Sequence, residues 1–376
     1  SGSPGQGFET MIVLTSWFRR TFDDPQVLFL GIVLFIGFGV VLGLGRMLAP
    51  VFASIVIAYL LEAVVARLQR LGLPRLLAVS LVFLFFLAIT FFLLFGLVPM
   101  LTRQLTQLVQ QIPSYLSQGQ ELLLQLPERY PQLVSEQQIQ QIISSAGAEV
   151  GAIGQQLLTW SLGSVGNVVG LLVLLVLIPV LVFFLLKDKR LLIDWFSAYM
   201  PTERHLVTSV WADVEAQIAN YVRGKAGEIV IVGAVSYITF VALGLDYAAL
   251  LATVVGFSVL IPYIGAAVVT IPIAFVAYFQ WGWGWDFGQV MIAYAIIQAL
   301  DGNVLVPLLF SEALNLHPVA IIVAILVFGG LWGFWGVFFA IPLATLVQAV
   351  LKAWPRNAKA QDGQEETSEA ADVATG

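Results

Sequence analysis

Asp301 is the residue whose chemistry is most distinctive in this sequence. It interrupts an apolar stretch, IIQALDGNVLVPLLF, that spans residues 296–310. A carboxylate at the centre of a membrane helix costs about 2.5–3.5 kcal/mol on insertion scales, so such a residue normally faces the protein interior or a wet cavity. There it could exchange a proton for a cation, or accept a hydrogen bond from a hydroxylated solute. The alternative is a structural role, in which Asp301 only bonds a neighbouring helix.

Polar residues and helix-breaking residues lie close to Asp301 in the chain. Gln298, three residues earlier, shares its helix face, whereas Asn303 joins the same site only if Gly302 unwinds the helix. A second break, IPYIG at 261–265, would leave unpaired carbonyls that could face the same cavity. The sequence therefore predicts a transport path lined by Asp301, Gln298, Asn303, Pro307, Pro262, Tyr263 and Gly265.

Three further residues are secondary candidates for this path. Glu228 opens another apolar stretch, and the alternative is that it is solvated at a membrane surface. Glu312 follows the Asp301 stretch. His317 precedes Pro318 and either shapes a turn or contacts the substrate.

Enzyme chemistry finds no support in the sequence. The chain has no cysteine and two histidines, which argues against thiolate nucleophiles, haem pairs and cysteine-type metal centres. It also lacks the G-x-S-x-G, Walker A and H-E-x-x-H patterns. We expect no catalytic residue, no metal, no cofactor and no nucleic-acid partner, and transport that is passive or ion-driven.

The elements that position these residues follow from composition. Hydrophobic residues make up 59% of the 376 residues and charged residues 11%, whereas soluble domains are about 25% charged. This predicts an all-α, polytopic membrane protein in contact with lipid. Residues 1–10 look like a cloning remnant before Met11, and the acidic residues 356–376 are expected to be disordered.

Stretches without charge define about eight transmembrane helices. With both termini inside, cytoplasmic segments hold 14 Lys and Arg residues and external ones hold 3, which fits the positive-inside rule. This predicts transmembrane helices 1–3 in 11–101, helix 4 in 157–186 and helices 5–8 in 228–355. The individual spans are expected near 27–45, 47–63, 76–101, 160–186, 228–245, 248–279, 288–310 and 318–351.

Two apolar stretches, 247–285 and 313–351, are too long for one straight crossing. As helix, each would reach about 58 Å against a hydrocarbon core of about 30 Å. Pro and Gly residues predict broken or re-entrant segments near 256–272 and 326–342. TIPIA at 270–274 also resembles AIPLA at 340–344, either as a parallel repeat or by chance.

Two insertions lie outside the apolar spans. Residues 102–156 hold 14 Gln and recurring Leu, which predicts an extracytoplasmic helical cap or a ligand-selecting lid; Pro113, Pro127 and Pro131 are expected to break it into short helices. Residues 187–227 predict cytoplasmic amphipathic helices, which lie against the membrane or against another subunit.

Five segments resemble one family. They are FFLLKDKR (183–190), IANYVRGK (218–225), LIPYIGA (260–266), DGNVLVPLLFSEALNLHPVAII (301–322) and GLWGFWGVFFAIPLA (330–344). The chain resembles the autoinducer-2 exporter (AI-2E) family of bacterial membrane transporters over roughly 25–355. The resemblance implies a secondary transporter, a bacterial inner-membrane location, a homo-oligomer such as a pentamer, and a polar cluster where Asp301, Gly302 and Asn303 stand.

Three functions remain open at this point. The leading hypothesis is export of a small polar solute or signal resembling autoinducer-2, with or without ion coupling. The second is exchange of sodium or lithium ions for protons at Asp301. The third is an oligomeric membrane scaffold or channel without coupled transport. The sequence does not identify the solute.

Overall fold

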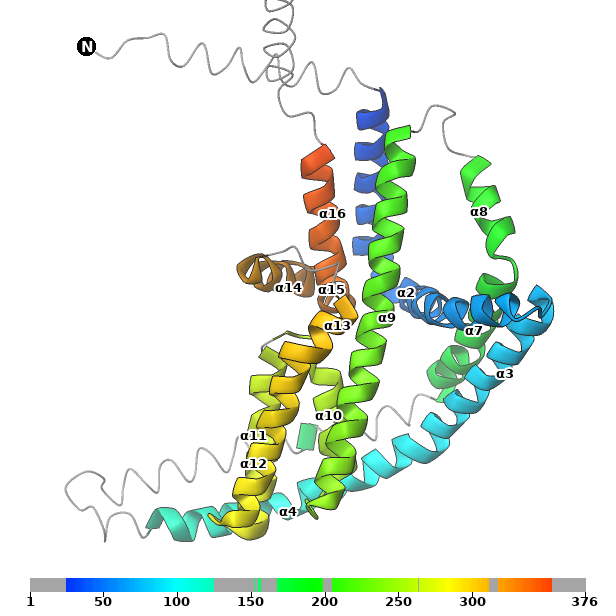
Figure 1. The fold of residues 1–376 in the computed structure, drawn as a ribbon. Helices are drawn as coiled ribbons and strands as arrows, with labels where there is room; N and C mark the ends of the chain where they lie inside the picture. Colours follow the sequence, from blue (N-terminus) through cyan, green and yellow to red (C-terminus); the bar gives the residue numbers. More distant parts are fainter. Residues whose placement is uncertain are drawn as a thin grey trace, which may run out of the picture. The chain divides into compact units, whose positions relative to one another are not determined.

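The structure is a computed structural model, and it describes residues 25–124, 168–198, 205–262, 264–310 and 317–353, with Ala152, Gln155 and Gln156. Every regular element in these ranges is a helix (Figure 1). The chain divides into two compact units. Unit 1 contains residues 1–49, 193–221 and 313–376, and unit 2 contains residues 50–192 and 222–312.

By length and composition, five helical stretches of the described residues are able to cross a membrane. Three shorter apolar helices accompany them. This confirms the prediction of an all-α, polytopic membrane protein. The five long stretches are Met47–Arg70, Arg75–Glu121, Glu215–Ala242, Ile264–Trp281 and Trp285–Phe310, and the shorter helices are Leu175–Lys187, Ala248–Ser258 and Pro318–Trp332.

Helix α2 runs without interruption from Pro25 to Arg70. The predicted separation of spans 27–45 and 47–63 at Arg46 is therefore wrong. A single Arg does not end a helix, and Pro50 is accommodated inside it, where the Ser54 hydroxyl donates to the Pro50 carbonyl at 2.7 Å. From Pro50 onward α2 belongs to unit 2.

Helices α2, α3 (Arg75–Phe92) and α7 (Val168–Lys187) share a small apolar core in unit 2. Its buried residues include Val65 of α2, Val79 of α3 and Val182 of α7. After α3 the helix continues through a π-helical turn, η1 (Leu93–Leu97), into α4 (Val98–Leu124). Pro113 lies inside α4, so the expected helix break at this residue is wrong; Pro127 and Pro131 lie outside the described residues.

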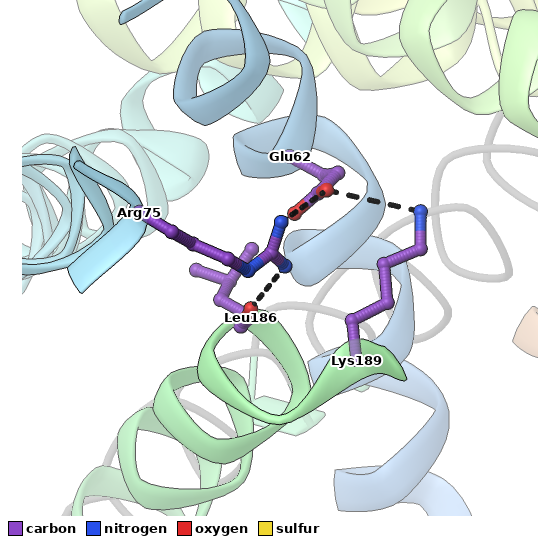
Figure 2. A network of polar contacts seen from close by, with 4 residues as sticks. All are labelled: Glu62, Arg75, Leu186 and Lys189. Carbon is purple, nitrogen blue, oxygen red and sulfur yellow. Dashed lines mark hydrogen bonds and ion pairs between the residues drawn. The ribbon is translucent and has the colours of Figure 1, made fainter. Parts of the chain in front are cut away.

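A polar network ties the ends of these helices together (Figure 2). Arg75 at the start of α3 lies 3.5 Å from the Glu62 carboxylate of α2, and it donates to the Leu186 carbonyl near the end of α7 at 2.6 Å. Lys189, the first residue of α8 (Lys189–Ala198), lies 3.8 Å from the same Glu62 oxygen. One arginine thus joins three helices.

The main apolar core of unit 2 is built from α9 (His205–Ala242), α10 (Ala248–Ser258), α11 (Ile264–Trp281) and α12 (Trp285–Leu300). Only the part of α9 from Val222 onward belongs to this unit. The amphipathic segment and the fifth span, predicted as separate at 227/228, are one helix. A π-helical segment, η2 (Asp301–Leu305), and α13 (Val306–Phe310) continue α12.

Unit 1 contains α14 (Pro318–Trp332), α15 (Phe334–Phe338) and α16 (Ala340–Ala353). The predicted break near 326–342 is present at Gly333, whose φ of 60° is the left-handed conformation that glycine adopts readily. The stretch expected as the eighth span, 318–351, is therefore three short helices.

Candidate transport site

A buried ion pair on α9 is the centre of the polar site in unit 2. The Lys225 ammonium lies 2.7 Å from the Glu228 carboxylate, and their side chains are only 4% and 2% exposed. These residues are one turn apart on a helix face that continues through Val232, Ser236 and Phe240, all buried. An ionisable pair inside a membrane-spanning helix is a candidate functional site by default, because its burial is costly.

Lys225 is held by two other helices as well. It donates a second hydrogen bond of 2.7 Å to the Val259 carbonyl, at the end of α10. Its ammonium also lies 5.4 Å from the ring centre of Phe310, the last residue of α13. Gly224 allows this approach, because a Cβ there would stand 2.6 Å from the Phe310 ring.

The Val259 carbonyl is exposed to Lys225 because the sixth predicted span is broken. Helix α10 ends at Ser258 and α11 begins at Ile264, so the predicted interruption near 256–272 is present. Gly265 packs so closely on the Ser258 carbonyl that a Cβ would overlap it. A backbone carbonyl released from its helix is a ligand for a positive charge, and here that charge is Lys225.

Asp301 is the third ionisable group of this site. Its carboxylate interacts electrostatically with Lys225 and with Glu228. It begins the π-helical segment η2, and such wide turns are frequent at functional sites. In the described part of the chain, Asp301 Oδ1 and Gln298 Nε2 are buried atoms without a hydrogen-bond partner.

The other predicted residues that the structure describes lie in different surroundings. Asn303 is exposed and donates to the Ala299 carbonyl at 2.8 Å, and Pro307 is also exposed. Pro262 is half-buried at the helix break. His317 caps α14 in the other unit, where its Nδ1 accepts a hydrogen bond of 3.3 Å from the Val319 amide, as expected of a residue that shapes a turn.

Tyr263 and Glu312 lie outside the described residues. Lys225 was missed by the sequence reasoning, which placed it in a cytoplasmic segment. The signal for it was present, because Lys225 and Glu228 have the three-residue spacing of a helical ion pair.

Helix α4 covers the other end of the α10–α11 pair. Gln104 accepts a hydrogen bond of 2.8 Å from the Leu250 amide, which is one of the free N–H groups at the start of α10. Tyr115 stacks on Phe279 of α11 at 4.8 Å between ring centres. Its hydroxyl donates to Gln111 at 2.6 Å and accepts from the Tyr247 hydroxyl. Gln104 therefore joins α4 to α10, whereas Gln111 is bonded within α4.

A buried charged cluster at a broken helix, in an all-helical membrane protein, is an arrangement typical of transporters. Comparison with known proteins agrees. The family model described as AI-2E family transporter matches residues 28–356. The chain belongs to the AI-2E transporter family.

Its relatives are named as transport proteins. A candidate permease of Escherichia coli (strain K12), PerM, is 45% identical over 93% of this chain and 99% of its own length. A candidate transport protein of Bacillus subtilis (strain 168), YueF, is 26% identical over 86% of this chain and 90% of its own. The AI-2 transport protein TqsA of Escherichia coli (strain K12) is 25% identical over 82% of this chain and 86% of its own.

Proposed function

We propose that this AI-2E family protein is a secondary transporter that exports a small polar solute or signal resembling autoinducer-2 across the bacterial inner membrane, coupled to an ion. The observation that carries the proposal is the buried Lys225–Glu228 pair with the half-buried Asp301, beside the α10–α11 break. Membrane helices rarely contain such residues unless they line a path for ions or solute. TqsA, a relative named for AI-2 transport, supports this class of solute.

Ion coupling rather than ATP hydrolysis supplies the driving force in this proposal. The sequence contains no Walker A pattern, whereas Asp301 offers a carboxylate that can change its charge. Exchange of sodium or lithium ions for protons is the second candidate function. The Asp301 carboxylate favours this function as well, because a carboxylate would bind a proton or a metal cation. A scaffold or an uncoupled channel would not require these charged side chains inside the membrane-spanning helices.

Transport in sealed proteoliposomes tests the proposal. Labelled autoinducer-2 and other small polar solutes are followed together with an internal pH dye, with and without a sodium gradient. We expect solute movement coupled to a pH change in the parent and loss of the coupling in Asp301→Asn. Asp286→Asn is the matched control, since Asp286 is an exposed acid at the start of the same helix. Equal coupling in parent and Asp301→Asn would overturn the proposal.

The resemblance to the family also supports a homo-oligomer, which we propose as a pentamer with both termini of each chain in the cytoplasm. Native mass spectrometry of the purified protein measures the number of subunits directly. If the purified protein transports solute but is found only as a monomer, this part of the proposal is wrong.

A further inference from the structure

The three ionisable groups of the site do not balance one another in charge. Lys225 contributes one positive charge, and Glu228 and Asp301 contribute one negative charge each when they are ionised. The group then carries a net charge of −1 inside a span where uncompensated charge is costly. One additional positive charge would make it neutral.

Most hydrogen-bonding groups of Lys225 are already occupied, so Lys225 does little to neutralise the remaining charge of Asp301. An ammonium group has three N–H donors. One is bound by Glu228, one by the Val259 carbonyl, and the Phe310 ring lies beside the group. Asp301 Oδ1, by contrast, is buried and has no hydrogen-bond partner within the described residues. The missing charge therefore belongs at Asp301.

Among the described residues, α10, α11, α12, η2 and α13 contain no Lys, Arg or His. Helix α10 has no ionisable side chain. The ionisable side chains of α11 and α12 are Tyr278, Asp286 and Tyr294. The Tyr294 hydroxyl is bound to the Ala266 carbonyl at 2.8 Å, and Asp286 is at the far, exposed end of α12. Arg223, the other cation of α9 within unit 2, is exposed, whereas the electrostatic interactions of Asp301 and Glu228 are with each other and with Lys225.

We propose that this site binds one proton, at the Asp301 carboxylate, and that the Lys225–Glu228 pair fixes the number at one. This inference rests on the proposed ion-coupled function and specifies its coupling site. Protonation converts the carboxylate into a neutral acid and changes the net charge of the group from −1 to 0. A metal cation suits the site less well, because hard cations take about six oxygen ligands, and Lys225 already binds the Val259 carbonyl and a Glu228 oxygen.

If the pair controls proton binding at Asp301, changes in the net charge of the pair should change that binding, which a role of Asp301 alone would not predict. Glu228→Gln leaves Lys225 and Asp301 with a net charge of 0, so Asp301 has no need of a proton. Replacing the pair with neutral residues, Lys225→Met together with Glu228→Gln, restores the net charge of −1. The single change removes proton binding at Asp301, and the double change recovers it.

Infrared difference spectroscopy of the purified full-length protein measures this binding without any solute. Spectra are recorded while the buffer is changed from alkaline to acid, and each background is compared with the same background carrying Asp301→Asn, so that all other carboxyl groups cancel. We expect one protonated-carboxyl band from Asp301 in the parent, none over the same pH range in Glu228→Gln, and its return in the double variant. Circular dichroism and gel filtration confirm that each variant is folded.

Each outcome decides the proposal. An unchanged Asp301 band in Glu228→Gln would overturn the role of the pair while leaving ion-coupled transport intact. Absence of the band in the parent would overturn proton binding at Asp301. A titration that shifts when sodium chloride replaces choline chloride would assign the site to a sodium ion instead. If the band behaves as expected but proteoliposomes show no coupled transport, the proposed function fails and the proton site stands.

Discussion

Gly265 packs against the Ser258 carbonyl, and this contact sets the geometry of the break between α10 and α11. A Cβ at Gly265 would overlap backbone atoms, which cannot move aside as a flexible side chain can. We therefore expect Gly265→Ala to lower the free energy of unfolding by about 1–3 kcal/mol, the usual cost of overpacking. The change in thermal unfolding midpoint of the purified protein measures it.

Gly288→Ala is the matched control for this prediction. Gly288 lies inside α12, and a Cβ there would meet nothing within 4 Å. Alanine favours a helix over glycine by up to about 1 kcal/mol, so this variant should be as stable as the parent or slightly more so. If Gly265→Ala were equally harmless, the close approach to Ser258 would not be what positions the break.

The two breaks were predicted well because each segment gathers several helix-disfavouring residues within a few positions, whereas single prolines such as Pro50 and Pro113 lie inside continuous helices. IPYIG and GGLWGFWG both interrupt helices at the expected places. Gly336 also packs on the Phe328 carbonyl as Gly265 packs on that of Ser258. Gly336 follows Gly265 by 71 residues, whereas AIPLA follows TIPIA by 70, so the parallel repeat stays a prediction.

The ends of the helices and the contacts of Lys225 were predicted less well. The sequence placed ends at Arg46 and at 227/228, where charge alone marked a boundary, but α2 and α9 continue through both. Charged residues are compatible with a helix, so a change in polarity does not define its end. The sequence predicts Lys225 in a cytoplasmic segment, because the Val259 carbonyl and Phe310, which contact it, are distant in the sequence.

The ring of Tyr115 should contribute more than its hydroxyl to the stability of the contact between α4 and the α10–α11 pair. Tyr115→Phe keeps the stacking on Phe279 and loses the bonds to Gln111 and Tyr247, and a hydrogen bond contributes about 0.5–1.5 kcal/mol. Tyr115→Ala also removes the buried ring, for about 3–5 kcal/mol. Chemical denaturation in detergent separates the two variants. Equal losses would mean that the ring contact contributes nothing.

Tyr247 should make stability fall in alkaline solution. Burial, the largest cause, raises the pKa of Tyr247 above its ordinary value. In the unfolded chain a tyrosine titrates near about pH 10. The stabilising contribution is therefore complete below that pH and declines as the pH rises above it, by up to roughly 1.4 kcal/mol per pH unit.

The unfolding midpoints of the parent and of Tyr247→Phe, compared at about pH 9 and about pH 11, measure this effect. We expect the variant to lose less stability than the parent over the interval. A parallel decline in both proteins would show that other groups cause the alkaline loss.

Arg75 should matter more than Lys189 in the network of Figure 2. Arg75 joins α2, α3 and α7 through the Glu62 carboxylate and the Leu186 carbonyl, whereas Lys189 makes one longer contact with Glu62. Arg75→Ala should cost about 1–2 kcal/mol of stability, because hydrogen bonds to charged groups are the stronger ones. Lys189→Ala should cost less than about 0.5 kcal/mol, as partly exposed pairs do. Thermal unfolding tests the order, and a larger loss in Lys189→Ala would reverse it.

The membrane orientation can be tested with cysteines, since the chain has none of its own. Six basic residues flank the start of α3 or the end of α7 (Arg67, Arg70, Arg75, Lys187, Lys189 and Arg190), whereas the segment between these two helices holds Arg103 and Arg129. This asymmetry places Gln120 of α4 outside and Ser209 of α9 inside. An impermeant thiol reagent applied to intact cells should therefore label Gln120→Cys and leave Ser209→Cys unlabelled until the membrane is opened. Labelling after permeabilisation is the control for the reactivity of each cysteine. The reverse pattern would invert the topology, so that α4 would cover the cytoplasmic end of the α10–α11 pair and the proposed direction of export would have to be reversed.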